Sequence, residues 1–111
     1  MARILIVEDN EDLRKMLAWV LQPHGYETLQ AATGKEGIEK AIAAQPGLIL
    51  LDIRLPDMNG VDVARAIKTN TRTAHIPIVG WSAVFRRALA RRSTARWNGR
   101  LHGKATFSAS N

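Results

Sequence analysis

Two short apolar segments of this sequence each end in acidic residues, and these acids are the first candidates for chemistry. Residues 3–7 read RILIV and run into Glu8 and Asp9, and residues 48–51 read LILL and run into Asp52. Unbroken apolar runs of this length are typical of strands buried on both faces of a parallel sheet. The carboxyl ends of such strands meet at the sheet edge where open α/β folds bind ligands. The pattern therefore predicts that the three carboxylates share one pocket.

Three carboxylates in one pocket repel one another unless a cation neutralises them. Hard oxygen ligands in that number suit Mg²⁺, and a carboxylate can also act as a nucleophile toward a phosphoryl group. Taken singly, an acid after a strand is more often a turn residue or a helix cap. Glu8 and Asp9 could equally begin a helix, where acids suit the positive end of the helix dipole. The two acidic ends together favour a metal site.

The sequence around these acids alternates between strand and helix patterns. We expect strands at residues 3–7, 26–31, 48–52 and 76–81, and helices at about 11–22, 35–44 and 61–68. Asn10 is placed to cap the first helix, and Thr33 with Glu36 to form a capping box for the second. The turn residues 55–60 (LPDMNG) leave Asp52 at the rim of its strand. This alternation predicts an α/β fold, a doubly wound parallel sheet with helices on both faces.

Length and composition set limits on the class of protein. A chain of 111 residues with 46% apolar residues fits one globular domain, and the lack of cysteine excludes disulfides and thiolate metal sites. No apolar stretch approaches the roughly 20 residues that span a bilayer. The amino terminus runs directly into a strand pattern, which argues against a signal peptide. We therefore expect a cytoplasmic protein with no membrane partner.

Residues 1 to about 83 resemble the receiver domain of bacterial two-component response regulators. The resemblance is greatest to single-domain regulators, which have no output module. The matching segments are residues 4–10 (ILIVEDN), 51–60 (LDIRLPDMNG), 76–79 (IPIV) and Ser82-Ala83. The resemblance implies a flavodoxin-like receiver fold. It also implies a signalling phosphoacceptor that is not an enzyme acting on other molecules. Its phosphodonor would be a histidine kinase or histidine phosphotransfer protein, and the sequence does not identify its downstream effector.

The resemblance further implies a role for individual residues. Asp52 would accept the phosphoryl group, and Asp9 and Asp52 would bind Mg²⁺ together with the backbone carbonyl of Arg54. Glu8 would assist through a water molecule, and Ser82 would be the hydroxyl residue that turns toward the phosphoryl oxygens. The side chain of Arg54 either reaches over the pocket to shield an acyl phosphate or is an ordinary solvated surface group.

The sequence departs from the family pattern after about residue 83. Residues 1–62 carry six Lys or Arg and ten Asp or Glu, whereas residues 63–111 carry ten Lys or Arg and no acid. We therefore expect a receiver-like core at 1–83 and a basic divergent segment at 84–111. In the basic segment, Lys104 falls where the family's phosphate-contacting Lys belongs.

The family's fifth strand and last helix have no recognisable counterpart in this segment, and Ala105 stands where Pro should follow the Lys. A shift of the reading frame near residues 80–84 would explain the departure. One permitted back-translation of residues 99–105, read one nucleotide later, gives Ala-Gly-Tyr-Met-Gly-Lys-Pro, which resembles the expected fifth strand. Without that strand, the fourth strand would be an exposed edge through which two chains could dimerise.

Three alternative functions remain at this point. The cations after residue 83 could bind nucleic acid electrostatically, with Trp97 and Phe107 stacking on bases, although no nucleic-acid-binding motif frames them. A phosphatase with Asp52 as nucleophile would want a second Asp two residues later, where Arg54 stands. A phosphorylation-impaired docking module would follow if Lys104 does not serve the site.

Overall fold

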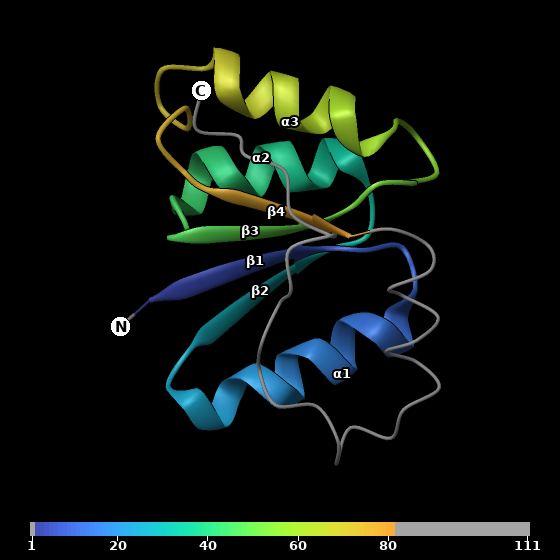
Figure 1. Cartoon of the computed structure of the whole chain (residues 1–111), viewed down its shortest axis with the longest axis vertical. Helices are drawn as coiled ribbons and strands as arrows, with labels where there is room; N and C mark the ends of the chain where they lie inside the picture. The colour runs from blue at the N-terminus through green and yellow to red at the C-terminus, as the bar shows by residue number, and fades with distance from the viewer. Residues whose placement is uncertain (1, 82–111) are drawn as a thin grey trace.

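The computed structural model describes residues 2–81 and shows a parallel sheet between helices (Figure 1). In chain order, its elements are β1 (Arg3–Val7), α1 (Glu11–Leu21), a 3₁₀ turn η1 (Gln22–His24), β2 (Glu27–Ala31), α2 (Gly34–Ala44), β3 (Leu48–Asp52), α3 (Gly60–Thr69) and β4 (Ile78–Trp81). The four strands are parallel and lie in the order β2-β1-β3-β4. The predicted doubly wound α/β fold is confirmed.

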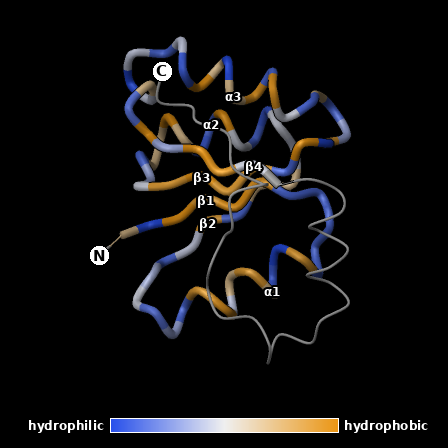
Figure 2. The backbone as a smooth tube through the Cα atoms, viewed as in Figure 1, coloured by the Kyte–Doolittle hydropathy of each residue, from blue (hydrophilic) through white to orange (hydrophobic). Residues whose placement is uncertain are grey.

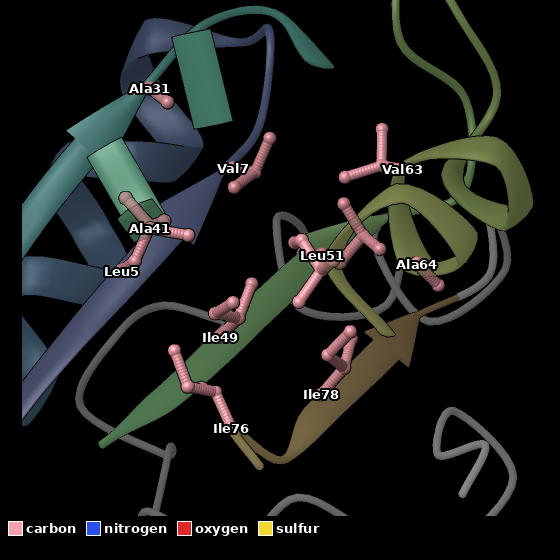
Figure 3. Close-up of a cluster of buried hydrophobic side chains, with 11 residues drawn as sticks. Leu5, Val7, Ala31, Ala41, Ile49, Leu51, Val63, Ala64, Ile76 and Ile78 are labelled. Carbon is pink, nitrogen blue, oxygen red and sulfur yellow. The ribbon is translucent and has the colours of Figure 1, made fainter. Parts of the chain in front are cut away.

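Helices cover both faces of the sheet, α1 on one and α2 with α3 on the other (Figure 1). Strands β1, β3 and β4 form the apolar centre of the molecule, and hydrophilic positions alternate with hydrophobic ones along the helices (Figure 2). Alternate residues of each strand face opposite ways, so they build two separate cores. The larger core packs Leu5, Val7, Ile49, Leu51 and Ile78 against α2 and α3 (Figure 3), and the smaller packs Ile4, Ile6 and Leu50 against α1.

Both helix caps expected from the sequence are present. The Asn10 side chain accepts a hydrogen bond from the Leu13 N–H at 3.1 Å, and the Thr33 hydroxyl oxygen accepts one from the Glu36 N–H at 3.1 Å. The Glu36 carboxylate accepts a hydrogen bond from the Ala32 N–H at 2.8 Å, one residue before the cap itself. Each cap satisfies backbone donors that a helix start leaves without an intrahelical partner.

The boundaries of two strands and of all three helices differ by one or two residues from the expected ones. Strand β2 begins at Glu27, one residue late, and β4 begins at Ile78, two residues late. At β4 the cause is Pro77, which has no N–H to donate and contributes only its carbonyl, to the Ile49 N–H at 3.0 Å. Helix α3 begins at Gly60, capped by Asn59.

Several expectations fall on residues outside the described part of the chain. They are the basic segment 84–111 and the altered fifth strand and last helix, and they stay predictions. The dimer through the edge of β4 is likewise untested and stays a prediction. Within residues 2–81, none of the helices combines the length and apolar character needed to cross a bilayer.

Candidate metal centre

The strand register brings the acidic ends of β1 and β3 to the same level. Val7 lies opposite Leu51 in the β1–β3 pair, so Glu8 and Asp52 are each the next residue along neighbouring strands. The chain passes from β1 outward to β2 and then returns to the other side of β1 to form β3. The gap between β1 and β3 is therefore a topological switch point, where sheets of this kind bind ligands.

The three predicted acids lie together at this switch point. Oxygen atoms from the carboxylates of Glu8, Asp9 and Asp52 are all within 4.8 Å of one another. Glu8 and Asp52 are buried, with 0% and 1% of their surface exposed, whereas Asp9 is exposed. The cluster thus has two carboxylates inside the sheet edge, and an ion or donor would approach it from the side of Asp9.

Backbone hydrogen bonds orient the two buried carboxylates. The Asn10 N–H donates to Glu8 Oε2 at 3.0 Å, and the Arg54 N–H donates to Asp52 Oδ1 at 3.1 Å. Each bond joins a carboxylate to the amide two residues later, at the point where the chain turns out of its strand. The turns that follow β1 and β3 therefore fix the directions in which Glu8 and Asp52 point.

The turn after Asp52 closes tightly at Gly60. The Gly60 N–H donates to the Ile53 carbonyl at 2.6 Å, and Arg54 and Asn59 form an isolated antiparallel bridge. A Cβ atom at Gly60 would lie 2.8 Å from the Asp52 carbonyl oxygen and 2.8 Å from the Ile53 Cα. Only glycine fits there without moving the backbone that carries Asp52.

A second acid in this turn, Asp57, ties the loop to α2. Its two carboxylate oxygens accept hydrogen bonds from the Gly34 and Lys35 N–H groups, at 2.8 and 2.9 Å. These bonds, first that from Lys35 and then that from Gly34, lower the pKa of Asp57. Asp57 lies in the turn expected from the sequence, but this contact is not predictable from it, because the partners lie more than twenty residues away.

A cation that the sequence analysis did not single out holds the loop after β1. The Arg14 guanidinium donates from Nη1 to the carbonyls of Glu8 and Asp9, at 2.7 and 3.2 Å. Its Nε donates to the side-chain oxygen of Gln30 on β2 at 3.3 Å. The only sequence signal for this role is helical geometry, because Arg14 follows the Asn10 cap by one turn and long side chains point back toward the helix start.

Of the remaining predicted site residues, Arg54 lies beside the cluster, with an exposed side chain and its backbone N–H on Asp52 Oδ1. Ser82 and Lys104 fall outside the residues that the structure describes. A cavity of about 370 Å³ lies at the opposite edge of the sheet, where β1 and β3 begin. The acidic cluster lies outside this cavity, whose lining includes Arg3, Tyr26 and Leu48.

The donor set of the cluster fits a hard divalent cation. Mg²⁺ takes oxygen ligands at 2.0–2.1 Å, so two ligands of one ion lie at most about 4 Å apart. Carboxylate oxygens up to 4.8 Å apart therefore need only a small side-chain adjustment, or one water between ion and carboxylate. The arrangement can hold a metal ion beside a buried carboxylate.

Comparisons with known proteins agree with this geometry. The model of the family described as the response regulator receiver domain matches residues 4–95, which continues past residue 83 into the basic segment. The polar-differentiation response regulator DivK of Brucella ovis is 36% identical over 80 residues, covering 72% of this chain and 65% of its own length. The chain thus spans 65% of the length of this curated relative.

Solved structures of related proteins have the same fold. The chemotaxis response regulator CheY4 of Vibrio cholerae superposes with a TM-score of 0.68 at 35% identity, over 70% of this chain and 65% of its own. The N-terminal domain of a response regulator receiver protein from Methanoculleus marisnigri gives a TM-score of 0.69 at 27% identity, over 81% and 77% of the two chains.

Proposed function

Because the chain belongs to the response regulator receiver family, we propose that it accepts a phosphoryl group on Asp52 in two-component signalling. The donor would be a phosphohistidine on a histidine kinase or a phosphotransfer protein. The observation that carries the proposal is the cluster of three carboxylates at the β1–β3 switch point, with Asp52 buried at the end of β3.

The transfer itself asks little covalent chemistry of the protein. An oxygen of the Asp52 carboxylate forms a bond to phosphorus while the nitrogen–phosphorus bond of the donor breaks and its electron pair returns to the imidazole ring. Phosphoryl transfer of this kind depends on positioning and on stabilising charge at the phosphoryl oxygens. The Arg54 N–H supports the positioning, because it holds the Asp52 carboxylate at the sheet edge.

We propose that Asp9, Asp52 and the backbone carbonyl of Arg54 hold Mg²⁺ directly, and that Glu8 holds it through a water. When bound, Mg²⁺ neutralises charge on the carboxylates and on the phosphoryl oxygens. The ion and the phosphodonor would enter from the side of the exposed Asp9. The buried Glu8 and Asp52 would keep their positions when neither is bound.

The consequence of phosphorylation would be a change at the end of β4. Asp52 lies opposite Trp81 in the β3–β4 register, and Ser82 is the next residue. A Ser82 hydroxyl that donates to a phosphoryl oxygen, with Lys104 as a second contact, would couple the new charge to the segment that follows β4. A partner protein reading that segment would then distinguish the two states.

Mass spectrometry of the intact protein tests the assignment. Incubation with acetyl phosphate and Mg²⁺ should add one phosphoryl group to the wild-type protein and none to Asp52→Asn. Asp12→Asn is the matched control, because it removes one carboxylate from an exposed position of α1 and should be modified like the wild type.

The outcomes separate this function from its alternatives. A phosphorylated Asp52→Asn variant would contradict the choice of acceptor. A wild-type protein that binds Mg²⁺ but stays unmodified, by acetyl phosphate and by a phosphorylated histidine phosphotransfer protein, would favour the docking module without phosphorylation. Omission of Mg²⁺ should abolish modification, since the metal site and the acceptor share Asp52.

A further inference from the structure

Arg14 contacts the backbone of the proposed metal site. One guanidinium nitrogen, Nη1, donates to the carbonyl oxygens of both Glu8 and Asp9, and these residues carry two of the three clustered acids. The guanidinium therefore grips the two peptide groups from which the acidic side chains project. The orientation of a peptide group determines where the side chain of the same residue can point.

The same side chain joins three elements. It arises from α1, contacts the loop after β1, and is held in turn by Gln30 of β2 at 3.3 Å. The loop is also fixed by the Glu8 N–H, which donates to the Ala31 carbonyl at 3.0 Å. Because Nε is bonded to Gln30 while Nη1 is bonded to the two carbonyls, Arg14 links the loop after β1 to strand β2.

Arginine suits this position better than lysine. Its planar guanidinium presents donors in a fixed fork, so Nη1 and Nε can bind the carbonyls and Gln30 at once. The positive charge also lies beside three negative groups that repel one another. It offsets part of that repulsion without competing for the metal, because its hydrogen bonds go to carbonyl oxygens and to an amide.

We propose that Arg14 is a positioning residue for the divalent cation, which holds the Glu8–Asp9 backbone so that both carboxylates meet Asp52. This inference rests on the proposed metal site. A site whose ligands are held in place before binding loses less conformational entropy when the ion arrives. Groups that orient metal ligands from outside typically contribute about 10–100-fold to affinity.

Calorimetric titration with MgCl₂ tests the role of Arg14. Arg14→Ala should weaken Mg²⁺ binding roughly ten-fold, and Arg14→Lys should weaken it as well because the fork is lost while the charge is kept. Lys15→Ala is the matched control, since Lys15 is the next residue of α1, is exposed and pairs only with Glu11 among the described residues. It should bind Mg²⁺ within about two-fold of the wild type.

A double-mutant cycle distinguishes positioning from a general loss of stability. Gln30→Ala should weaken Mg²⁺ binding in the wild-type background and have little further effect in Arg14→Ala, because Gln30 acts through Arg14. Additive effects of the two substitutions would overturn the proposal. If Arg14→Ala does not fold, the Arg14→Lys and Gln30→Ala variants carry the test.

The test also separates this proposal from the proposed function. Wild-type protein that does not bind Mg²⁺ would overturn the metal site, and the role of Arg14 with it. Wild-type protein that binds Mg²⁺, together with folded Arg14 variants of unchanged affinity, would overturn the role of Arg14 alone. In that case the phosphoacceptor function would stand.

Discussion

At the scale of single residues, the site depends on backbone groups as much as on the acids themselves. The Asn10 and Arg54 amides orient Glu8 and Asp52, and the Arg14 guanidinium holds the carbonyls of the first acidic loop. Each contact is a hydrogen bond of about 3 Å. Together they keep like charges at close range, which the carboxylates alone would resist.

Asp57 should make the stability of the protein depend on pH. The Lys35 and Gly34 N–H groups lower the pKa of its carboxylate in the folded state below the ordinary value of about 3.9. The unfolded chain therefore takes up the proton first as the pH falls, and the stabilisation by Asp57 is lost through the range below about pH 4. Above about pH 5 the full contribution should be present.

Urea unfolding of the wild type and of Asp57→Asn between pH 3 and 7 measures this dependence. The wild type should be the more stable protein at neutral pH, and the difference should shrink as the solution becomes more acidic. Asp12→Asn controls for the loss of one negative charge. A difference that stays constant down to pH 3 would show that the hydrogen bonds to α2 do not depend on the ionised carboxylate.

At the scale of elements, the turn between β3 and α3 directly follows Asp52, the proposed acceptor, and is held by contacts of Gly60 and Asp57. Gly60 closes it against the Ile53 carbonyl, and Asp57 joins it to the start of α2. Asn59 then begins α3 by accepting a hydrogen bond from the Asp62 N–H at 2.8 Å. The turn is thus a fixed connection, so Asp52 keeps its place relative to the helices on that face.

Gly60→Ala should displace the acceptor turn. The new Cβ would meet backbone atoms at 2.8 Å, which cannot rotate away as a side chain could. We expect a loss of about 1–3 kcal/mol in the free energy of unfolding and slower phosphorylation by acetyl phosphate. Gly47→Ala is the control, because a Cβ atom added at Gly47 would lie 3.7 Å from its nearest neighbour, the Arg3 carbonyl oxygen, which is an ordinary van der Waals distance.

Circular dichroism during urea unfolding gives the stability, and the time course of intact mass gives the phosphorylation rate. The Gly47 variant should match the wild type in both. If Gly60→Ala were as stable and as reactive as the wild type, the close approach at this turn would not constrain the acceptor.

The sequence was sufficient to predict the strands and the acids at their ends. It was insufficient to predict the hydrogen bonds that hold the loops carrying those acids. Strands β1 and β3 were placed with their observed bounds because buried parallel strands are continuous apolar runs with sharp ends. The proximity of Asp9 to Asp52 followed from parallel topology alone. The contacts of Arg14 and Asp57 join segments distant in the chain, and periodicity carries no information on such pairs.

The predicted start of β4 was wrong because local hydrogen bonding and a proline outweighed the apolar pattern. Ile76 is buried like a strand residue, but its N–H donates to the Thr73 carbonyl and Pro77 cannot donate, so β4 starts later. The roles predicted for Ser82 and Lys104 rest on family resemblance, and both residues lie outside the described part of the chain.

At the scale of the whole molecule, charge is distributed unevenly along the chain. All ten Asp and Glu lie within residues 1–62. Residues 63–111 contain ten Lys and Arg and no acid. The proposed metal site lies in the acidic part, whose net negative charge favours the approach of divalent cations. The protein as a whole is nevertheless basic, with a formal charge of +6.

Mg²⁺ should therefore stabilise the whole fold through this one site. At a hundred times its dissociation constant, an ion that binds only the folded state adds about 2.7 kcal/mol to the free energy of unfolding. Asp52→Asn should raise the stability of the protein without Mg²⁺, because it removes one of three like charges, and should reduce the gain from Mg²⁺.

Thermal unfolding with MgCl₂ or with EDTA measures both effects, and the Asp12→Asn variant should respond to Mg²⁺ as the wild type does. An equal gain from Mg²⁺ in Asp52→Asn and in the wild type would place the responsible ion elsewhere on the molecule.

The order of strands in the sheet also has a consequence for how the protein is made. Glu8 and Asp52 are neighbours only after β3 has inserted beside β1, and all of β2 and α2 are synthesised between them. A nascent chain lacks the acidic cluster proposed to bind Mg²⁺ until this long-range pairing forms, and such pairings form slowly compared with local helices. The appearance of Mg²⁺ binding during refolding would therefore report when β1 and β3 pair.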